Sequence, residues 1–501
     1  MKLFQLNTLL QLRLKHLYFI LLIVLFTGCT VGPDYHTPTE QLPSHYKATG
    51  KQYSSAVDNI NWWNSLGDPL LVKLINQAVG GDNLDIQKAQ ATVRQARAAL
   101  GVTSADLYPQ LDANGKISRD HLSGNSEIIG SFPPGVIPLY YTDYQFGFDA
   151  SWELDFFGYT RRSIEASKAR LESDIENQND VEITTAAEVA RNYIQYRIDQ
   201  QRILITKHTI ASYVETAKLV NIQLEAGLAT VADLHRVESE VLSAQASLPS
   251  LEAEAQATLN ALAVMVGEYP ETLSEQLNIP APIPVINPKN ISVGLPSDLL
   301  QQRPDVRSAE RQLAAATADI GVATANEYPR FELVGDLGSD TVFPGTFTHA
   351  ASRYWSIAPK VVIPLFQGGR LRGEVKENEA ARDVALANYK KSILQALADV
   401  ETAMVRYDNE QLREKNLRAS YEKEQSVAKL IKIQYVDGQA SLIDVLDVER
   451  QVNQLNDEYA QSLGQVSINL VSLYKSLGGA WPTAKKPGKA GKSGTPFESI
   501  K

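Results

Sequence analysis

The chain has 501 residues, enough for two or three ordinary domains or one elongated one. Charged residues make up 21% of it and aromatic residues 8%, which excludes an intrinsically disordered chain. The formal net charge is −10, the pI is near 5.4 and no basic stripe is present, which excludes a typical nucleic-acid-binding surface.

Residues 1–28 have the pattern of a secretory signal peptide. Lys2, Arg13 and Lys15 give a basic start without any acidic residue, and an almost wholly apolar run of 12 residues follows, from Leu17 to Gly28. Because this run is too short to cross a bilayer of roughly 30 Å as a helix, it indicates a signal-peptide core rather than a transmembrane anchor.

The only cysteine of the chain, Cys29, comes directly after this run. A lone cysteine cannot form an internal disulfide. Its position is similar to that of the lipidated cysteine in a bacterial lipobox, so we expect a covalent lipid on Cys29 and no other cofactor. An ordinary signal peptide with a coincidental cysteine is the alternative. Thr30, rather than Asp, follows Cys29, which favours sorting to the outer membrane.

After an arm that we expect to be extended, two related helices are predicted. The first, from Asn83 to about Leu107, is rich in Ala, Gln and Arg, and the second runs from Pro304 to Glu327. At an offset of 220, nine residues of the first helix region recur in the second: Asp85, Ala89, Ala96, Ala98, Gly101, Val102, Ala105, Tyr108 and Pro109. The sequence therefore contains an internal repeat.

Two short strands are predicted after each of these helices. The clearest runs from Asp143 to Phe156, where apolar and mainly aromatic residues alternate with polar residues over fourteen positions. Weaker alternation marks strands at 111–118, 331–337 and 355–363. Two loops of different length, Ser123–Pro138 and Gly338–Ser352, separate the members of each pair.

Four strands cannot close a sandwich or a barrel alone. Strands of this length with aromatic ends, in a chain sent to the outer membrane, favour transmembrane β-strands. Open sheet edges are not tolerated in lipid, so several copies of the chain would have to close one barrel. A soluble β-hairpin cap is the alternative.

The rest of the chain predicts long helices. From about Thr160 to Leu224 there is neither Pro nor Gly, and apolar residues recur at alternating steps of three and four. The same pattern occupies the return arm from Leu234 to Met265, in which Pro249 should cause a kink, and the arm from Val445 to Leu473. Polar residues at several of these positions argue for an assembly wider than a two-stranded coil.

The repeat is closest at 219–248 and 430–459. At an offset of 211, seven residues of the first segment meet identical residues in the second: Ile222, Gln223, Gly227, Ala229, Asp233, Val237 and Glu238. Gly227 and Gly438 are placed to end a helix, and Thr230 and Ser441 to cap the next one. The chain therefore predicts two helical hairpins with matching tips.

These patterns divide the chain into six parts. They are a signal peptide (1–28), an extended N-terminal arm with lipidated Cys29 (29–82), a first repeat (83–279), a linker (280–303), a second repeat (304–479) and a flexible tail rich in Lys, Gly and Pro (480–501).

Together the motifs of the chain resemble the TolC-type outer-membrane efflux family, in particular its lipidated branch that serves tripartite resistance-nodulation-division pumps. The motifs are Cys29–Tyr35, Trp62-Trp63 with Asp68-Pro69, Arg303-Pro304-Asp305-Val306, Tyr328–Phe331, Pro364–Phe366 with Gly368-Gly369, and both hairpin tips. The resemblance covers residues 29 to about 480.

This resemblance implies a mainly α fold with a small membrane β part. Three copies would form a homotrimer with a 12-stranded outer-membrane barrel, four strands per protomer, and a periplasmic α-barrel. The implied partners are a periplasmic adaptor, an inner-membrane pump and outer-membrane lipid, and no nucleic acid.

The resemblance also implies site residues. Asp444, Asp447 and Tyr435 match the gate at the closed periplasmic entrance, although spacing alone favours a helix cap for Asp444 and a solvated Asp447. Ala440 stands where one well-known member has a tip arginine, so the locking bonds are expected to differ. The implied adaptor-contacting tips are Gly227, Leu228, Ala229, Gly438, Gln439 and Ala440.

Asp149, Glu153 and Asp155 fall on the polar side of the clearest strand, where they are candidates to line a lumen or simply form a solvated face. No enzymatic or metal-binding motif is found. Gly488–Ser493 only faintly resembles a phosphate loop, since its spacing is too short and no strand precedes it, and seven scattered His make no ligand cluster.

We therefore expect a passive exit duct of a tripartite efflux system, gated at its periplasmic end and exporting drugs or other small toxic compounds. A type I secretion duct for proteins is one alternative, and a non-pore structural lipoprotein or adhesin is another.

Overall fold

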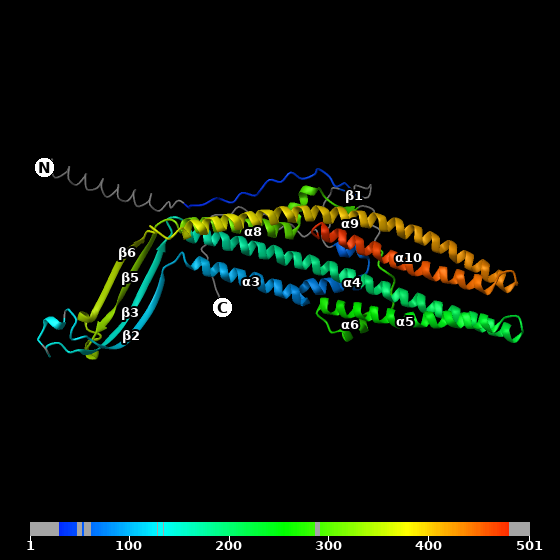
Figure 1. Cartoon of the computed structure of the whole chain (residues 1–501), viewed down its shortest axis with the longest axis horizontal. Coiled ribbons are helices and arrows are strands. Elements are labelled where there is room, and N and C mark those ends of the chain that lie inside the picture. The colour runs from blue at the N-terminus through cyan, green and yellow to red at the C-terminus, as the bar shows by residue number, and fades with distance from the viewer. Residues whose placement is uncertain are drawn as a thin grey trace. The chain divides into compact units, whose positions relative to one another are not determined.

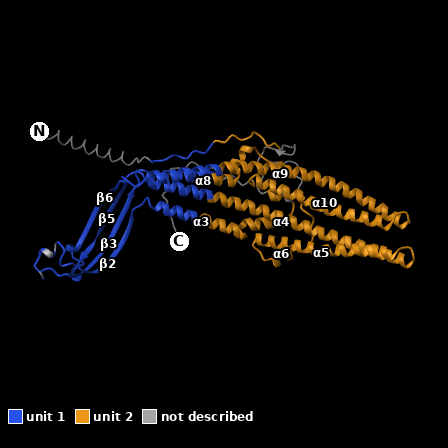
Figure 2. Ribbon diagram, viewed as in Figure 1, with its two compact units in different colours: residues 1–38, 94–173, 310–388 blue, residues 39–93, 174–309, 389–501 orange. Residues whose placement is uncertain are grey.

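The computed structural model of the chain describes residues 30–47, 53–54, 62–127, 129–133, 135–285 and 291–479. The predicted signal peptide, Cys29 and the predicted tail (480–501) lie outside these residues. The chain divides into two compact units (Figure 2). Unit 1 comprises residues 1–38, 94–173 and 310–388, and unit 2 comprises residues 39–93, 174–309 and 389–501.

Unit 1 contains one antiparallel four-stranded sheet with the order β2-β3-β5-β6 (Figure 1). The strands are β2 (Gln110–His121), β3 (Tyr140–Leu154), β5 (Arg330–Thr341) and β6 (Arg353–Val362). They confirm the four predicted strands. Two edges, on β2 and β6, have no neighbouring strand in the described part of the chain.

The strand register confirms the predicted two-faced sheet. On one face Phe148 lies opposite Leu337, which lies opposite Trp355, and all three are exposed. On the other face Asp149 lies between Asp112 and Asp336. An exposed aromatic face on a four-stranded sheet is unusual in water and is typical of a lipid-facing surface.

Four helices precede or follow these strands in the chain. They are α3 (Leu84–Ala105), which precedes β2, α4 (Tyr159–Glu225), which follows β3, α8 (Pro304–Ala325), which precedes β5, and α9 (Arg370–Val436), which follows β6. Both halves of the chain thus have the same order of helix, two strands and long helix, in agreement with the repeat.

In unit 2, α4 and α9 turn back into α5 (Val231–Val266) and α10 (Leu442–Ser476), which gives the two predicted hairpins (Figure 1). The α5 helix continues through Pro249. Apolar residues at the predicted steps of three and four are buried, for example Val237 and Leu262 in α5 and Val445 and Leu473 in α10.

Smaller elements complete the fold. The α-helical ones are α2 (Pro69–Gln77), α6 (Pro270–Leu277) and α7 (Leu299–Gln302). A π-helical turn covers Ala78–Asp82, and short 3-10 turns lie at Trp62–Leu66, Ile129–Ser131, Pro296–Asp298, Pro344–Thr346 and Ala350–Ser352. β1 (Tyr53–Ser54) pairs in parallel with β4 (Ile291–Ser292).

Two sequence-based expectations need correction. Residues 69–82 were predicted within an extended arm, but they are helical: Asp68 accepts hydrogen bonds from the first turn of α2, whose Leu71 and Leu74 are fully buried. The strand predicted to end at Phe156 ends at Leu154. Among the described residues, no helix has an apolar stretch long enough to cross a bilayer.

Candidate functional site

The two hairpin tips have the same backbone geometry. Gly227 and Gly438 end α4 and α9 with φ angles of 72° and 74°, a left-handed conformation that favours glycine. The next amide closes each helix, since Leu228 donates to the carbonyl of Gln223 and Gln439 to that of Gln434, both at 2.7 Å. This is a Schellman-type ending, as the sequence predicts.

Each return helix begins with a complete capping box. In the first tip, Thr230 and Asp233 exchange side-chain and backbone hydrogen bonds, and in the second Ser441 and Asp444 do the same. The carboxylate of Asp444 accepts from the amide of Ser441 at 2.8 Å and from its hydroxyl at 2.7 Å. These bonds lower the pKa of Asp444 and, through Thr230, that of Asp233.

One apolar cluster joins the two hairpins near their tips. Tyr213, Val220 and Val237 of the first hairpin pack with Leu442 and Leu446 of the second, and all five side chains are buried. This contact lies wholly within unit 2. It fixes α10 with its apolar residues against the first hairpin and leaves the opposite side of its first turns exposed.

Two of the predicted gate residues lie on this exposed side. Asp444 and Asp447 are both exposed, whereas their neighbours Val445 and Leu446 are buried. Asp447 accepts a hydrogen bond from Arg450 at 3.0 Å, and Arg450 also donates to Glu240 at 2.9 Å. Asp447 is therefore exposed to solvent, as its spacing suggested, and is also paired with Arg450, which reduces its expected repulsion from Asp444.

The third predicted gate residue, Tyr435, lies on the other side of the turn. Its hydroxyl donates to the side-chain oxygen of Gln223 at 2.6 Å, which links the second hairpin to the first. The corresponding residue of the first hairpin at the offset of 211 is Leu224, which has no hydroxyl to form such a bond. The first hairpin therefore cannot donate an equivalent hydrogen bond to the second from this position.

The residues predicted to contact an adaptor lie at the ends of both hairpins. Four of them, Gly227, Leu228, Gly438 and Gln439, are exposed, and the Leu228 side chain is 80% exposed. Ala229 and Ala440 are half-buried, with Ala229 packed against the cluster between the hairpins.

The structure separates the three candidate lumen residues. Asp149 is exposed in β3 and accepts a hydrogen bond from Asn114 of β2, and Glu153 is half-buried in the same strand. Asp155 lies just beyond β3, and its carboxylate accepts from the amides of Thr160 and Arg161 at 3.2 and 2.9 Å. It caps the N-terminus of α4 and does not belong to the polar strand face.

Comparisons with known proteins identify the family. The model of the outer membrane efflux protein family matches the chain twice, at residues 74–268 and 295–479, together more than half of its length. The chain belongs to this family. The two matches also agree with the internal repeat.

Relatives and a solved structure place the whole chain in this family. The toluene efflux pump outer membrane protein TtgI of Pseudomonas putida is 30% identical, over 92% of this chain and 98% of the relative. The probable outer membrane lipoprotein SilC of Salmonella typhimurium is 28% identical, over 92% and 97%. The structure of the outer-membrane channel OprN matches with a TM-score of 0.83 and 32% identity, over 90% of this chain and 99% of that one.

This member of the outer membrane efflux protein family is therefore the outer-membrane channel of a tripartite efflux system, and the predicted fold class is confirmed. Its relatives and structural neighbours are channels rather than enzymes. Among the residues that the structure describes, no group of three or more His, Cys, Asp or Glu could hold a metal ion.

The Arg303-Pro304-Asp305-Val306 motif, to which the sequence alone assigns no role, has a structural one. The guanidinium of Arg303 is nine-tenths buried and donates to both carboxylate oxygens of Asp305, at 3.0 and 2.7 Å. It also donates to Asp399 of α9 at 3.1 Å and to the carbonyl of Ser476, at the end of α10, at 3.0 Å. Arg303 therefore ties the start of α8 to α9 and α10.

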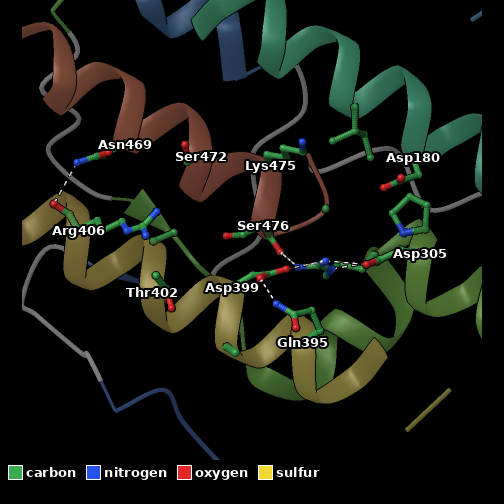
Figure 3. Close-up of a pocket in the computed structure, with 16 residues that line it drawn as sticks. Asp180, Asp305, Gln395, Asp399, Thr402, Arg406, Asn469, Ser472, Lys475 and Ser476 are labelled. Carbon is green, nitrogen blue, oxygen red and sulfur yellow. Dashed lines mark hydrogen bonds and ion pairs between the residues drawn. The ribbon is translucent and has the colours of Figure 1, made fainter. Parts of the chain in front are cut away.

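A polar cavity of about 470 Å³ surrounds this arginine. Figure 3 shows Asp180, Asp399, Arg406, Asn469 and Lys475 on its wall. Burial, together with the nearby charge of Asp305, raises the pKa of Asp180. Acidic and basic groups occur in similar numbers here, so the cavity has no clear preference for a charged ligand.

Proposed function

We propose that three copies of the chain close one barrel and one helical tube, which form a passive exit duct gated at its periplasmic tips. The observation that carries this proposal is the sheet of unit 1. Its strands have 10 to 15 residues, one face is apolar and exposed, and both edges lack a neighbouring strand among the described residues. An open edge cannot remain unpaired in lipid, so β6 of one copy must pair with β2 of the next.

The gate in this proposal is formed by Asp444 and Asp447 of each copy. Both are exposed at the start of α10, whereas Leu442 and Leu446 are buried against the first hairpin, so the two carboxylates can approach the same residues of other copies. Exposed carboxylates brought close together repel one another unless cations bind between them. Such a constriction would close by cation binding and open when its charges separate.

The other parts of the proposal rest on the sequence and the family. The exposed tips from Gly227 to Ala229 and from Gly438 to Ala440 are the surfaces offered to a periplasmic adaptor, which would join the channel to an inner-membrane pump. Cys29 is the proposed lipidation site, in keeping with the lipoprotein description of SilC. The cargo is a small toxic compound, as the description of TtgI as a toluene efflux protein suggests.

Single-channel recording in planar bilayers tests the gate. The full-length protein carrying both Asp444→Asn and Asp447→Asn should show a conductance several times that of the wild type and weaker block by divalent and trivalent cations. Asparagine keeps the size of the side chain and its ability to accept from Ser441, so the cap at the start of α10 remains.

Asp233→Asn is the matched control, because Asp233 forms the same capping box in the first hairpin. Conductance and cation block should not change in this variant. If the double variant leaves both properties at wild-type values, Asp444 and Asp447 are not the gate. If the wild type and the variants all fail to conduct, the duct itself is wrong.

Arg450→Ala sharpens the same test. This substitution removes the cation paired with Asp447, so it should strengthen cation block, the opposite of the effect of Asp447→Asn. Equal changes in the same direction would mean that the tip responds to a loss of packing rather than to charge.

A further inference from the structure

The segment that directly follows Cys29 is bound along the surface of unit 1. The amide of Val31 donates to the carbonyl of Phe157, just before α4, at 3.1 Å. Arg162, in the first turn of α4, is only 4% exposed and donates to the carbonyls of Val31 and Gly32 at 3.1 and 3.3 Å. Its guanidinium also pairs with Asp34 at 2.7 Å. A buried arginine with this many partners is a built binding site.

Three glycines let the backbones meet at this place. A Cβ on Gly32, which has a φ of 87°, would lie 2.4 Å from the Cα of Gly321 in α8. A Cβ on Gly158 would lie 2.2 Å from the methyl carbon of Thr30, and a Cβ on Gly321 would lie 2.8 Å from the stem of Arg162. Any larger residue at these positions would displace residues 30–34 or Arg162.

The following residues are bound to α8. The hydroxyl of Tyr35 donates to Glu310 at 2.5 Å, and the ring of Tyr35 lies under the guanidinium of Arg311, 5.6 Å from its centre. Thr37 donates to the same carboxylate at 3.2 Å. The Tyr35 ring also packs on Ala169, Ala314 and Ala315. Residues 31–37 therefore bridge α4 of the first repeat and α8 of the second.

Among the residues that the structure describes, this site is built in one half of the duplicated chain and not in the other. At the repeat offsets, Gly158 corresponds to Gly369 and Gly321 to Gly101, but Arg162 corresponds to Gly373. A Cβ on any of these three counterparts would meet no atom within 4 Å. Both halves of the repeat therefore have these glycines, whereas the arginine that binds residues 31–34 is present only at position 162 and not at its counterpart.

We propose that the Arg162 site is the docking site for the segment after Cys29, and that it fixes where a lipid on Cys29 enters the membrane. The proposal rests on the proposed lipidation of Cys29. Thr30, the first described residue after Cys29, lies against Gly158, four residues after β3 ends. Docking of this segment would therefore hold the lipid anchor close to the junction of strand and helix. Undocked, the eight residues from 30 to 37 would let it move by up to about 28 Å.

Hydrogen exchange measured by mass spectrometry tests the docking. In the full-length lipidated protein in phosphatidylcholine nanodiscs, the peptide covering residues 30–38 should be protected at the amide of Val31, which donates to the carbonyl of Phe157. Arg162→Ala removes several charge-assisted hydrogen bonds that hold this segment, so the Val31 amide should exchange at least about tenfold faster. Gly158→Ala and Gly321→Ala should have the same effect through steric displacement.

The repeat provides matched controls. Gly369 has a φ of 86° against 85° for Gly158, so Gly369→Ala imposes the same backbone strain without striking Thr30. Gly101→Ala adds the same methyl group to α3 as Gly321→Ala adds to α8. Arg161→Ala removes the neighbouring arginine, which is bonded to Asp155. None of the three should change exchange at residues 30–38.

A second readout follows the anchor itself. Because the lipid would occupy the only natural thiol, a fluorophore can be attached through Pro33→Cys, at an exposed position. Spin-labelled lipids of different depth should quench it with one narrow depth profile, which Arg162→Ala should broaden and Arg161→Ala should not. A purely structural role of Arg162 would leave the profile narrow.

Three outcomes would overturn the docking. Residues 30–38 of the wild type could exchange as fast as in Arg162→Ala, or the control variants could raise this exchange rate as much as their counterparts do. The third is a quenching profile that does not change in Arg162→Ala. The mass of the N-terminal peptide is a separate measurement. A peptide without lipid would reject the lipidation of Cys29 whatever the exchange rates show.

Discussion

The first and second hairpin tips share their turns but not their surroundings. Both use a left-handed glycine, a Schellman-type ending and a capping box. Leu442 and Leu446 at the start of α10 are nevertheless buried against the first hairpin, whereas their counterparts Val231 and His235 at the start of α5 are exposed. The same local structure therefore sits in two different environments.

Residues that are identical in the two tips can still differ in burial. Glu238 and Glu449 correspond at the offset of 211, yet Glu238 is half exposed and Glu449 is mostly buried. Turn chemistry is determined by a few neighbouring residues, so duplication preserves it. The environment of a helix face depends on residues far away in the chain, so small changes on that face make the two copies unequal.

The largest effect is expected from the apolar contact between the hairpins. Leu446→Ala should lower the free energy of unfolding by about 2–5 kcal/mol, because it removes a buried side chain and leaves a cavity among Tyr213, Val220 and Val237. Denaturant unfolding in detergent, followed by circular dichroism, measures this loss. His235→Ala, the equivalent change in the first hairpin, should shift it by no more than about 0.5 kcal/mol.

Equal losses for the two substitutions would contradict the proposed difference between the tips. Equal and small losses would mean that the hairpins do not depend on this contact. Equal and large losses would mean that the first tip is buried by something that the single chain does not show, such as another copy.

Most of the fold could be predicted because it depends on local patterns. Alternation identified the four strands, long runs without Pro or Gly identified α4, and the repeat assigned the same elements to both halves. The short helix α2 was missed, although the spacing of Leu71, Leu74 and Ile75 after Asp68 and Pro69 is a helix signal.

The site was only partly predictable, because side chains that pair across the fold have no fixed spacing in the sequence. The capping role of Asp444 follows from Ser441 three residues earlier, and the structure contains that cap. The pairing of Asp447 with Arg450, and of Arg450 with Glu240, could not be chosen from many possible charge pairs. Arg162 was missed for the same reason, since its partners in the segment after Cys29 lie about 130 residues earlier in the chain.

An intermediate effect is expected from the hydrogen bond between the hairpins. Tyr435→Phe removes the donor to Gln223 and should lower the free energy of unfolding by about 0.5–1.5 kcal/mol. A double-mutant cycle with Gln223→Ala isolates the interaction, and its coupling energy should be of similar size. The matched cycle uses Gln434→Ala, since Gln434 is the exposed counterpart of Gln223, and its coupling with Tyr435→Phe should be near zero. A zero value in both cycles would exclude the bond as a link between the tips.

The smallest effect on the free energy of unfolding is expected from a substitution of Glu449, which tests how burial affects a titrating carboxyl group. One of its oxygens accepts from Ser212 at 3.1 Å, while its Oε2 has no hydrogen-bond partner among the described residues. Burial raises the pKa of Glu449 above its ordinary value, although Lys432 and Ser212 partly oppose this. The folded state therefore binds the proton more tightly than the unfolded state, and the stability from this group falls as the pH rises from the unfolded pKa through the folded one.

Glu449→Gln removes the ionisation and keeps an acceptor for Ser212. At pH 7 it should raise the free energy of unfolding by about 1 kcal/mol or less, and the gain should disappear below about pH 4, where the wild-type carboxyl is protonated in both states. Unfolding measured between about pH 3 and pH 8 tests this. Glu238→Gln is the matched substitution at the half-exposed counterpart, and it should give no gain in the free energy of unfolding at pH 7. If the two variants show the same pH dependence of stability, burial of Glu449 is not its cause, and the two glutamates differ in burial without differing in their effect on stability.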